Sequence, residues 1–306
     1  MSIFSRLARS AQAFRRELLR SDEGRISTPA PTSRPKVGLA LGGGFARGLA
    51  HIGVLKVLEE ARIPIDFVAG TSVGALVGAI YCSGVPAKEM EEIAALVRFR
   101  DFARWTVSRY GFASNDRMTV LLNKLLKVKT FEELRIPLAV TATDFLTGEP
   151  VLFRRGPLID PVRASCAYPG MFLPVEIEGR MLVDGLLAHA VPTEPLRKGG
   201  ADRVIAVFLR SNLMDGCSGP RHVFDVIGQC FSIAQSRMSA IWQKDADIVL
   251  EPDVTGFAYD CFDRSRELVQ IGEAAARAAL PTIRQWFPKA PVAAKATAPQ
   301  VEPAIP

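Results

Sequence analysis

Residues 65–84 read IDFVAGTSVGALVGAIYCSG, in which a short apolar run ends at G-T-S-V-G and a small-residue helical pattern follows. Strand, G-x-S-x-G and helix in this order are typical of a nucleophile elbow, a turn so sharp that neighbouring side chains would collide. Gly70 and Gly74 remove those side chains, so the hydroxyl of Ser72 is expected to stand clear above the sheet with a helix N-terminus behind it. The five-residue pattern alone arises often by chance, and its strand-to-helix setting is what makes it informative.

A second glycine-rich turn, GGGFARG at residues 42–48, follows an apolar strand pattern at residues 37–41. A dinucleotide fingerprint would need its last glycine at Arg47, and a P-loop would need Lys and Ser/Thr after Gly48, so both interpretations fail. An oxyanion hole remains, because glycines let backbone N–H groups approach a ligand oxygen closely. A plain tight turn would explain one or two glycines better than three. The predicted donors are Gly42, Gly43 and Gly44.

A nucleophilic serine needs a base. Asp184 ends a short strand pattern and is followed by Gly185, at the kind of position where α/β active sites collect. His189, five residues later, is the one histidine near it in the sequence, so the residues alone leave a Ser–His–Asp triad and a Ser–Asp dyad open. His51 lies on an apolar helix face and is interpreted as a core residue. His222 opens a helix and is interpreted as a surface residue.

Strand and helix patterns alternate through the body of the chain, which predicts an α/β fold with a mostly parallel sheet and helices on both faces. Strands are expected at residues 37–41, 66–69, 136–143, 151–153, 181–183, 204–209 and 247–250. Helices are expected at residues 46–61, 75–80, 89–99, 118–126, 159–167, 222–242 and 263–286.

Four blocks, in order, resemble the patatin-like phospholipase family, especially its compact bacterial members: GLALGGGFARGLAHIGVLKVLEE, AGTSVGAL, ASCAYPGMFLPV and MLVDGLLAHAVP. The resemblance covers about residues 36–287. It implies a serine–aspartate dyad that cleaves lipid acyl esters without a metal or other cofactor. Carried over, Ser72 is the nucleophile, Asp184 its base and His189 a bystander, with Arg47 in the family's basic position beside the glycine loop.

One residue departs from the family pattern. Leu186 follows Asp184-Gly185 where the family usually has Gly or Ala, and a larger side chain there is expected to narrow the pocket or alter the aspartate's loop. The third block, residues 164–175, has no chemical role that its residues alone suggest.

The net positive charge of the chain is concentrated near its N-terminus. Residues 1–36 carry a net +5 of the total +6, so the body lacks the basic excess of a nucleic-acid-binding protein and no such partner is expected. An apolar stripe among the arginines of residues 1–20 predicts a basic amphipathic helix. Contact with an anionic membrane, packing on its own domain and a leader or transit peptide all remain open for this helix.

The expected organisation is an N-terminal arm and linker at residues 1–35, a catalytic domain at 36–287 and an Ala/Pro-rich, disordered tail at 288–306. Five scattered cysteines without CxxC spacing indicate free thiols rather than disulfides or a zinc site. Neither a secretory signal nor an apolar run of the roughly 20 residues needed to span a bilayer is evident. A cytoplasmic protein is expected, with peripheral membrane contact and oligomeric state left open.

The resulting hypothesis is a serine acyl hydrolase acting on a lipid or other acyl-ester substrate. A soluble carboxylesterase or thioesterase is one alternative. A low-activity regulatory or scaffold protein on the same fold is another, because a fold does not fix a function.

Overall fold

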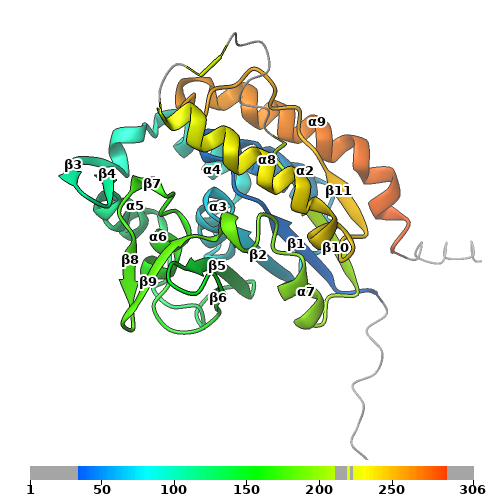
Figure 1. Cartoon of the computed structure of the whole chain (residues 1–306). Coiled ribbons are helices and arrows are strands. Elements are labelled where there is room, and N and C mark those ends of the chain that lie inside the picture. The colour runs from blue at the N-terminus through cyan, green and yellow to red at the C-terminus, as the bar shows by residue number, and fades with distance from the viewer. Residues whose placement is uncertain (1–33, 211–218, 221–222, 288–306) are drawn as a thin grey trace, which may run out of the picture. The chain divides into compact units, whose positions relative to one another are not determined.

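The computed structural model describes residues 34–210, 219–220 and 223–287 (Figure 1). The expected N-terminal helix at residues 1–20 and the expected tail at residues 288–306 lie outside these residues.

A central sheet organises the fold. Within the described residues it has eight strands in the order β11-β10-β1-β2-β5-β9-β8, with β6 paired to β5. The parallel strands are β11 (Ile248–Leu250), β10 (Arg203–Val207), β1 (Val37–Leu41), β2 (Phe67–Thr71) and β5 (Leu138–Asp144). The antiparallel additions are β9 (Arg180–Asp184), β8 (Val175–Ile177) and β6 (Pro150–Phe153). The prediction of a mostly parallel sheet is confirmed.

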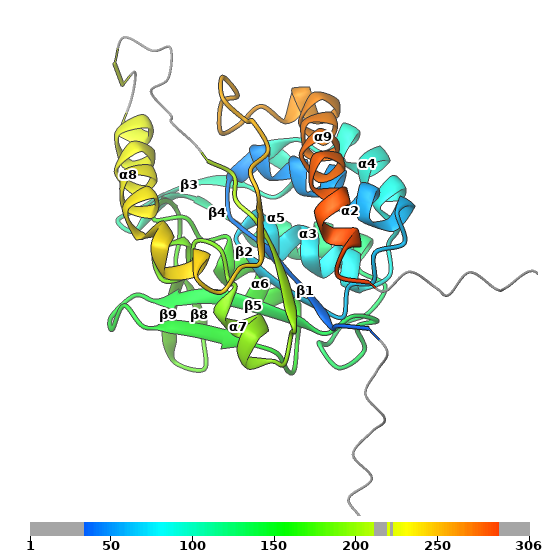
Figure 2. The ribbon, with the colours of Figure 1, turned by 90° about the vertical axis from the view of Figure 1, so that its right-hand side faces the viewer.

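Both faces of the sheet are covered, because successive side chains of a strand point to opposite faces. In β1, Leu39 and Leu41 belong to a large buried cluster with residues from the helices α2 (Ala50–Glu60), α3 (Val73–Cys82), α4 (Ala87–Leu96) and α9 (Ser265–Arg284). Ala40 belongs to a smaller cluster with residues from α7 (Glu194–Lys198) and the end of α8 (Val223–Gln243). Figure 2 shows α2, α3, α4 and α9 gathered on one side.

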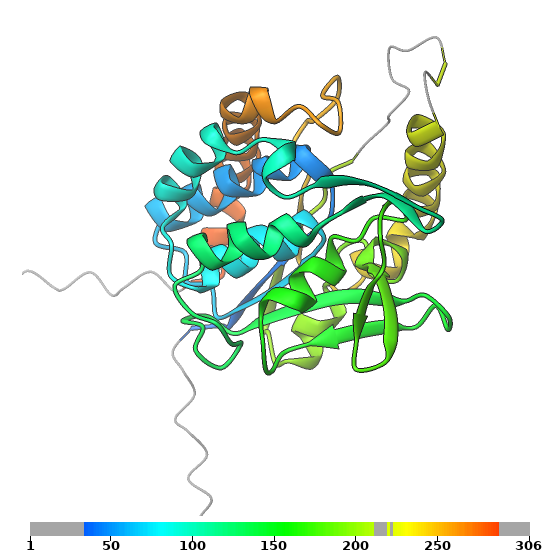
Figure 3. The same cartoon turned by 90° about the vertical axis from the view of Figure 1, so that its left-hand side faces the viewer.

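A second, three-stranded sheet was not expected from the sequence. It consists of β3 (Arg104–Ser108), β4 (Gly111–Ser114) and β7 (Gly170–Phe172). In chain order, α5 (Asp116–Leu125) follows β4, and α6 (Ile159–Ser165) precedes β7. Strands β3 and β4 form an antiparallel hairpin, and Figure 3 shows the ribbon from the side on which this hairpin lies. The helix expected at residues 46–61 begins instead as a 3-10 helix, Phe45–Leu49, before α2.

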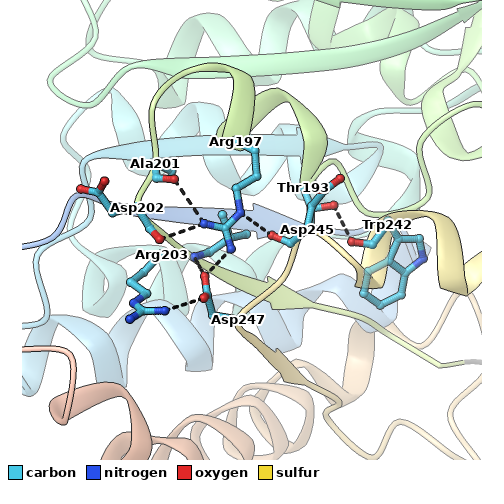
Figure 4. A network of polar contacts seen from close by, with 9 residues as sticks. Thr193, Arg197, Ala201, Asp202, Arg203, Trp242, Asp245 and Asp247 are labelled. Carbon is cyan, nitrogen blue, oxygen red and sulfur yellow. Dashed lines mark hydrogen bonds and ion pairs between the residues drawn. The ribbon is translucent and has the colours of Figure 1, made fainter.

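A polar network ties the strand starts together at the end of the sheet near α7 (Figure 4). The Arg197 guanidinium donates to the backbone oxygens of Asp245 and Asp202, each at 2.8 Å, and also to the Asp247 carboxylate. Arg203 donates to the same carboxylate at 2.9 Å. This network fixes α7 against β10 and β11, and it lies apart from the residues predicted to be catalytic.

In the described part of the chain, none of the helices combines the length and the apolar character that a bilayer crossing requires.

Candidate active site

The turn between β2 and α3 has the backbone of an elbow. Ser72 has φ 55° and ψ −125°, a conformation that costs a non-glycine residue about 1–3 kcal/mol and that surrounding structure must hold in place. A Cβ atom on Gly70 would lie 2.5 Å from the Gly74 carbonyl oxygen, and one on Gly74 would overlap the Leu41 carbonyl oxygen. Both positions therefore require glycine: Gly70 because of the turn itself, as predicted, and Gly74 because the backbone at the end of β1 lies against it.

Ser72 and Asp184 meet although they are far apart in the sequence. The Ser72 Oγ–H donates to Asp184 Oδ2 at 2.7 Å, and Asp184 Oδ1 accepts the Leu186 N–H at 2.9 Å. Asp184 is fully buried and Ser72 is 6% exposed. Burial raises the pKa of Asp184 to about 7, although the hydrogen bonds from Ser72 and Leu186 act in the opposite direction. The result is a carboxylate with proton affinity well above that of an ordinary aspartate, in direct contact with a hydroxyl.

The histidines lie elsewhere. His189 Nε2 is 3.7 Å from the Glu194 carboxylate, and burial lowers the His189 pKa. No hydrogen bond connects the His189 side chain to Ser72 or Asp184 in the described residues. His222 lies outside the described residues.

His51 is buried, as predicted, and it also contacts the glycine loop. Its Nε2 lies 2.8 Å from the Gly42 carbonyl oxygen, and burial lowers its pKa to about 4. The imidazole is therefore neutral at physiological pH, and we assign the Nε2–H as the donor to this carbonyl because only that tautomer makes the bond. His51 thus fixes the first residue of the loop from beneath.

The three glycines of the loop are not equivalent. The Gly42 N–H donates to the Val207 oxygen at 3.1 Å and the Gly43 N–H makes a longer bond, 3.3 Å, to the Ala190 oxygen. The Gly44 N–H has no hydrogen-bond partner within the part of the chain that the structure describes. Gly42 is therefore already occupied in holding the loop, whereas Gly44 has a free donor.

Leu186, the departure from the family pattern, packs against this loop. A Cβ atom on Gly43 would overlap the Leu186 side chain, which is itself buried. The large side chain at position 186 and the glycine at position 43 therefore fit one another, and Leu186 forms part of the pocket wall as expected.

Arg47 supplies a buried positive charge beside the loop. It is 6% exposed, and its Nε has no hydrogen-bond partner among the described residues. Burial lowers the Arg47 pKa to about 10, so the guanidinium remains charged at neutral pH. It lines one pocket together with Gly43, Gly44, Tyr168 and Gln235. Among the described residues no carboxylate pairs with Arg47; a buried cation without such a partner is costly, and an anionic ligand group would offset that cost.

A second, apolar cavity lies beside Ser72. It encloses about 880 Å³ of empty space, part of it open to solvent, and Ser72 lies in its wall. The remaining lining is almost entirely aliphatic and aromatic. It includes Leu76, Val77 and Ile80 of α3, Met90 and Ala94 of α4, and Leu121 and Leu125 of α5. Phe45 lines both pockets, so the serine stands near a boundary between a charged and an apolar space.

The block at residues 164–175, which had no evident role in the sequence, supports the nucleophile. The Ser165 Oγ accepts the backbone N–H of Ser72 at 2.8 Å, and Ser165 is fully buried. The Cys166 thiol contacts the Ser72 hydroxyl, and burial raises the Cys166 pKa, so it stays a neutral thiol. In the sequence, the small polar residues of this block were the available indication that it contacts the site.

Threonines hold the ends of neighbouring strands. The Thr71 hydroxyl donates to the His189 oxygen at 2.7 Å and lies 2.6 Å from the Thr141 hydroxyl. The Thr143 hydroxyl donates to the backbone oxygen of Asp184 at 2.9 Å. These bonds link β2, β5 and β9 where the candidate residues emerge. Nothing in the sequence around these threonines marked them, because each partner is distant in the chain.

The described ranges contain no group of three or more His, Cys, Asp or Glu side chains placed to hold a metal ion.

Comparisons with known proteins agree with the resemblance in the sequence. The family model described as patatin-like phospholipase matches residues 39–197. An uncharacterized NTE family protein of Mycobacterium tuberculosis is 35% identical over 196 residues, covering 59% of this chain and 51% of that protein. Lysophospholipase NTE1 of Mycosarcoma maydis is 32% identical over 231 residues, covering 72% of this chain and 12% of that protein.

The chain therefore spans about half the length of the first of these relatives and a small part of the second. The crystal structure of VipD from Legionella pneumophila aligns with a TM-score of 0.48 and 12% identity, over 82% of this chain and 67% of that one. The family model covers more than half of the chain, and on that basis the chain belongs to the patatin-like phospholipase family.

Proposed function

We propose that this chain is a serine acyl hydrolase that cleaves acyl esters of lipids, with residues 36–287 as its catalytic domain. The observation that carries the proposal is the 2.7 Å hydrogen bond from Ser72 Oγ to Asp184 Oδ2, with Ser72 in the wall of an apolar cavity. Family membership and the name of the fungal relative, a lysophospholipase, are consistent with it.

In this mechanism Ser72 Oγ attacks the ester carbonyl carbon while its proton passes to Asp184. The carbonyl oxygen gains negative charge, which the Gly44 N–H, the weakly bonded Gly43 N–H and the positive potential of Arg47 stabilise. The tetrahedral intermediate collapses, the alcohol leaves with the proton from Asp184, and an acyl-serine remains. Water then attacks the acyl-serine, with Asp184 accepting its proton and returning it to Ser72.

The two pockets suggest how the substrate lies. An acyl chain fits the apolar cavity that contains Ser72, because burying methylene groups there is favourable by about 0.8 kcal/mol each. The alcohol part then faces the pocket of Arg47, where an anionic group would find a buried cation. This division favours a lipid ester over a small water-soluble ester, the alternative left open by the sequence.

The test compares Ser72→Ala and Asp184→Asn with His189→Ala as the matched control. We expect the first two to lose at least about a thousandfold in turnover of lysophosphatidylcholine and of simple acyl esters, and the control to stay within a few-fold of wild type. A fluorophosphonate probe should label wild-type protein at Ser72 and leave Ser72→Ala unlabelled. An active Asp184→Asn together with an inactive His189→Ala would overturn the dyad and make His189 the base. Folded protein that neither turns over esters nor reacts with the probe would favour the scaffold interpretation.

A further inference from the structure

The helix α8 presents an apolar surface to solvent. Its 21 residues include only two charged ones, Asp225 and Arg237. One side faces the site, since Phe231 and Gln235 line the pocket of Arg47. The other side carries large apolar residues that are each 47–56% exposed. These are Val223, Val226 and Ile233, which fall on one stripe of the N-terminal half of the helix. Met238 and Ile241, 43% and 58% exposed, line a second hollow together with Phe231 and Gln235.

The β3–β4 hairpin carries a second set of exposed apolar residues. Trp105 is 66% exposed, Tyr110 52% and Phe112 54%. The guanidinium of Arg109 stacks over the ring of Tyr110, 4.7 Å from its centroid. Tryptophan and tyrosine next to arginine are the residues that prefer the boundary between a bilayer and water.

The two sets flank the same opening. Strand β4 pairs with β7 at Gly111↔Gly170 and Ala113↔Phe172, and Met171 of β7 lines the pocket of Arg47. On the other side α8 packs on β7, where Ile227 lies against Gly170. Strand β7 therefore contacts both the hairpin and α8. Exposed apolar residues scattered singly are ordinary, but a cluster around a pocket mouth marks an interaction surface.

The charge around the hairpin indicates what this surface meets. Residues 98–117 contain five arginines and two aspartates, a net +3 in a body that carries about +1 over 270 residues. Arg109 has no carboxylate partner in the described residues, and the ion pair of Arg104 with Asp116 is long, 3.5 Å. An anionic bilayer supplies both an apolar interior and negative head groups.

We propose that α8 and the β3–β4 hairpin form a docking surface for an anionic lipid bilayer, which brings the pocket mouth onto the membrane. The biological role of this surface rests on the proposed function, because a lipid hydrolase must reach a substrate that resides in membranes. Its binding to vesicles can nevertheless be tested independently, because binding is measured without turnover. The surface consists of residues other than those of the basic helix expected at residues 1–20.

The test uses the full chain with Ser72→Ala, so that lipid is not consumed, and vesicles of phosphatidylcholine alone or with one quarter phosphatidylglycerol. Trp105 is a local reporter, since the segment of residues 1–20 contains no tryptophan. We expect the Trp emission to shift to shorter wavelength with anionic vesicles and to be quenched by brominated lipid. Both changes should disappear in Trp105→Phe, in which Trp242 and Trp286 remain. Vesicle binding with no change in Trp105 emission would overturn the proposal.

Binding itself is measured by vesicle flotation of four further variants. Tyr110→Ser and Ile233→Ser should each weaken binding about tenfold, whereas Leu152→Ser on β6, 41% exposed and distant from the hairpin in Figure 1, should not. Arg109→Gln should weaken binding to anionic vesicles about fivefold and leave neutral vesicles unaffected. Equal binding by all four variants would overturn the proposal. So would a change in oligomeric state of Ile233→Ser without vesicles, which would make the surface a contact between copies of the chain.

Discussion

Asp184 is the residue at which stability and chemistry conflict most directly. It is fully buried, and that burial raises its pKa to about 7. As a base it must be ionised, so its burial reduces the active fraction at low pH while giving the carboxylate the proton affinity that attack by a serine requires. An exposed aspartate would be ionised at every physiological pH and would be too weak a base.

We therefore expect kcat/KM for a non-ionising ester to rise with pH and to level off above an apparent pKa near 7. A pH–rate profile between pH 5 and pH 9 checks this, and a profile of His189→Ala is the control. If His189 were the base, its replacement would abolish the rise of kcat/KM with pH. An activity that is flat down to pH 5 would contradict a protonated, buried Asp184.

The same burial predicts a stability effect. Between pH 4 and pH 7 the folded chain holds a proton on Asp184 that the unfolded chain has released. The free energy of unfolding therefore falls as pH rises through this range, and above pH 7 the buried, ionised Asp184 destabilises the folded chain by the full amount. Asp184→Asn should therefore stabilise the protein by about 2–4 kcal/mol at pH 8 and progressively less toward pH 4. Urea unfolding at several pH values measures the difference.

The titration of His51 changes the free energy of unfolding with pH in the opposite direction, so its contribution must be distinguished from that of Asp184 in that experiment. Its pKa falls to about 4 in the folded chain, so between pH 4 and pH 6.5 the unfolded chain binds the proton and stability rises with pH. The two slopes offset one another in the wild type. In Asp184→Asn the rise of stability with pH should become visible, with contributions from His51 and from His189, whose pKa burial also lowers. An advantage of Asp184→Asn that grows toward low pH would refute the assignment.

At the scale of elements, the elbow is held by hydroxyls from neighbouring segments. The strained Ser72 backbone directs its N–H to Ser165 Oγ on α6. Ser165→Ala would leave this buried N–H without a partner, at a cost of about 1–3 kcal/mol. We expect kcat to fall about tenfold with little change in KM, because the residue positions the nucleophile and does not touch the substrate.

Ser83→Ala is the matched control, since Ser83 is also buried and its hydroxyl donates to the Ile80 oxygen within α3. Its loss should lower the unfolding temperature without lowering kcat. Equal kcat losses in both variants would show that Ser165 acts only through general stability.

Patterns within one segment were enough to predict most elements. The strand at 37–41 and the helices now seen as α2, α3, α8 and α9 were identified because their apolar periodicity is strong. The β3–β4–β7 sheet was missed, since its strands are only three to five residues long and β7 is distant in the chain from β3 and β4. Its available signal was the β-branched and aromatic run at residues 105–107, followed by a turn at Arg109-Tyr110-Gly111.

The candidate site also contains residues that a pattern within one segment predicts and residues that no such pattern predicts. Gly70 and Gly74 could be predicted because they belong to the local G-x-S-x-G pattern, although the close contact that excludes a side chain at Gly74 comes from Leu41 of β1. Ser165 and the threonines could not, because their hydrogen bonds join residues 41 to 118 positions apart. Only the folded chain brings such partners together.

At the scale of the whole molecule, the apolar cavity lies among the helices α2, α3, α4 and α5. It extends along α3 from Ser72 to Ile80, a distance of about 12 Å at the rise of an α-helix. Helices α4 and α5 close its other side. Under the proposed function, packing between helices, far from the reacting atoms, sets the length of acyl chain that the cavity accepts.

Val77→Phe should shorten this space. Val77 is 4% exposed and lines the cavity beyond the first turn of α3, so a larger ring there occupies the position of the distal methylene groups. We expect turnover of a palmitoyl ester to fall at least about tenfold relative to a butyryl ester. Val120→Phe adds the same volume at a residue that is 57% exposed and outside the cavity, and it should leave the ratio unchanged. Because both esters are assayed on the same folded enzyme, a general loss of stability lowers both rates together. An unchanged ratio in Val77→Phe would mean that the acyl chain lies elsewhere, and the pocket of Arg47 would then be the remaining candidate for it.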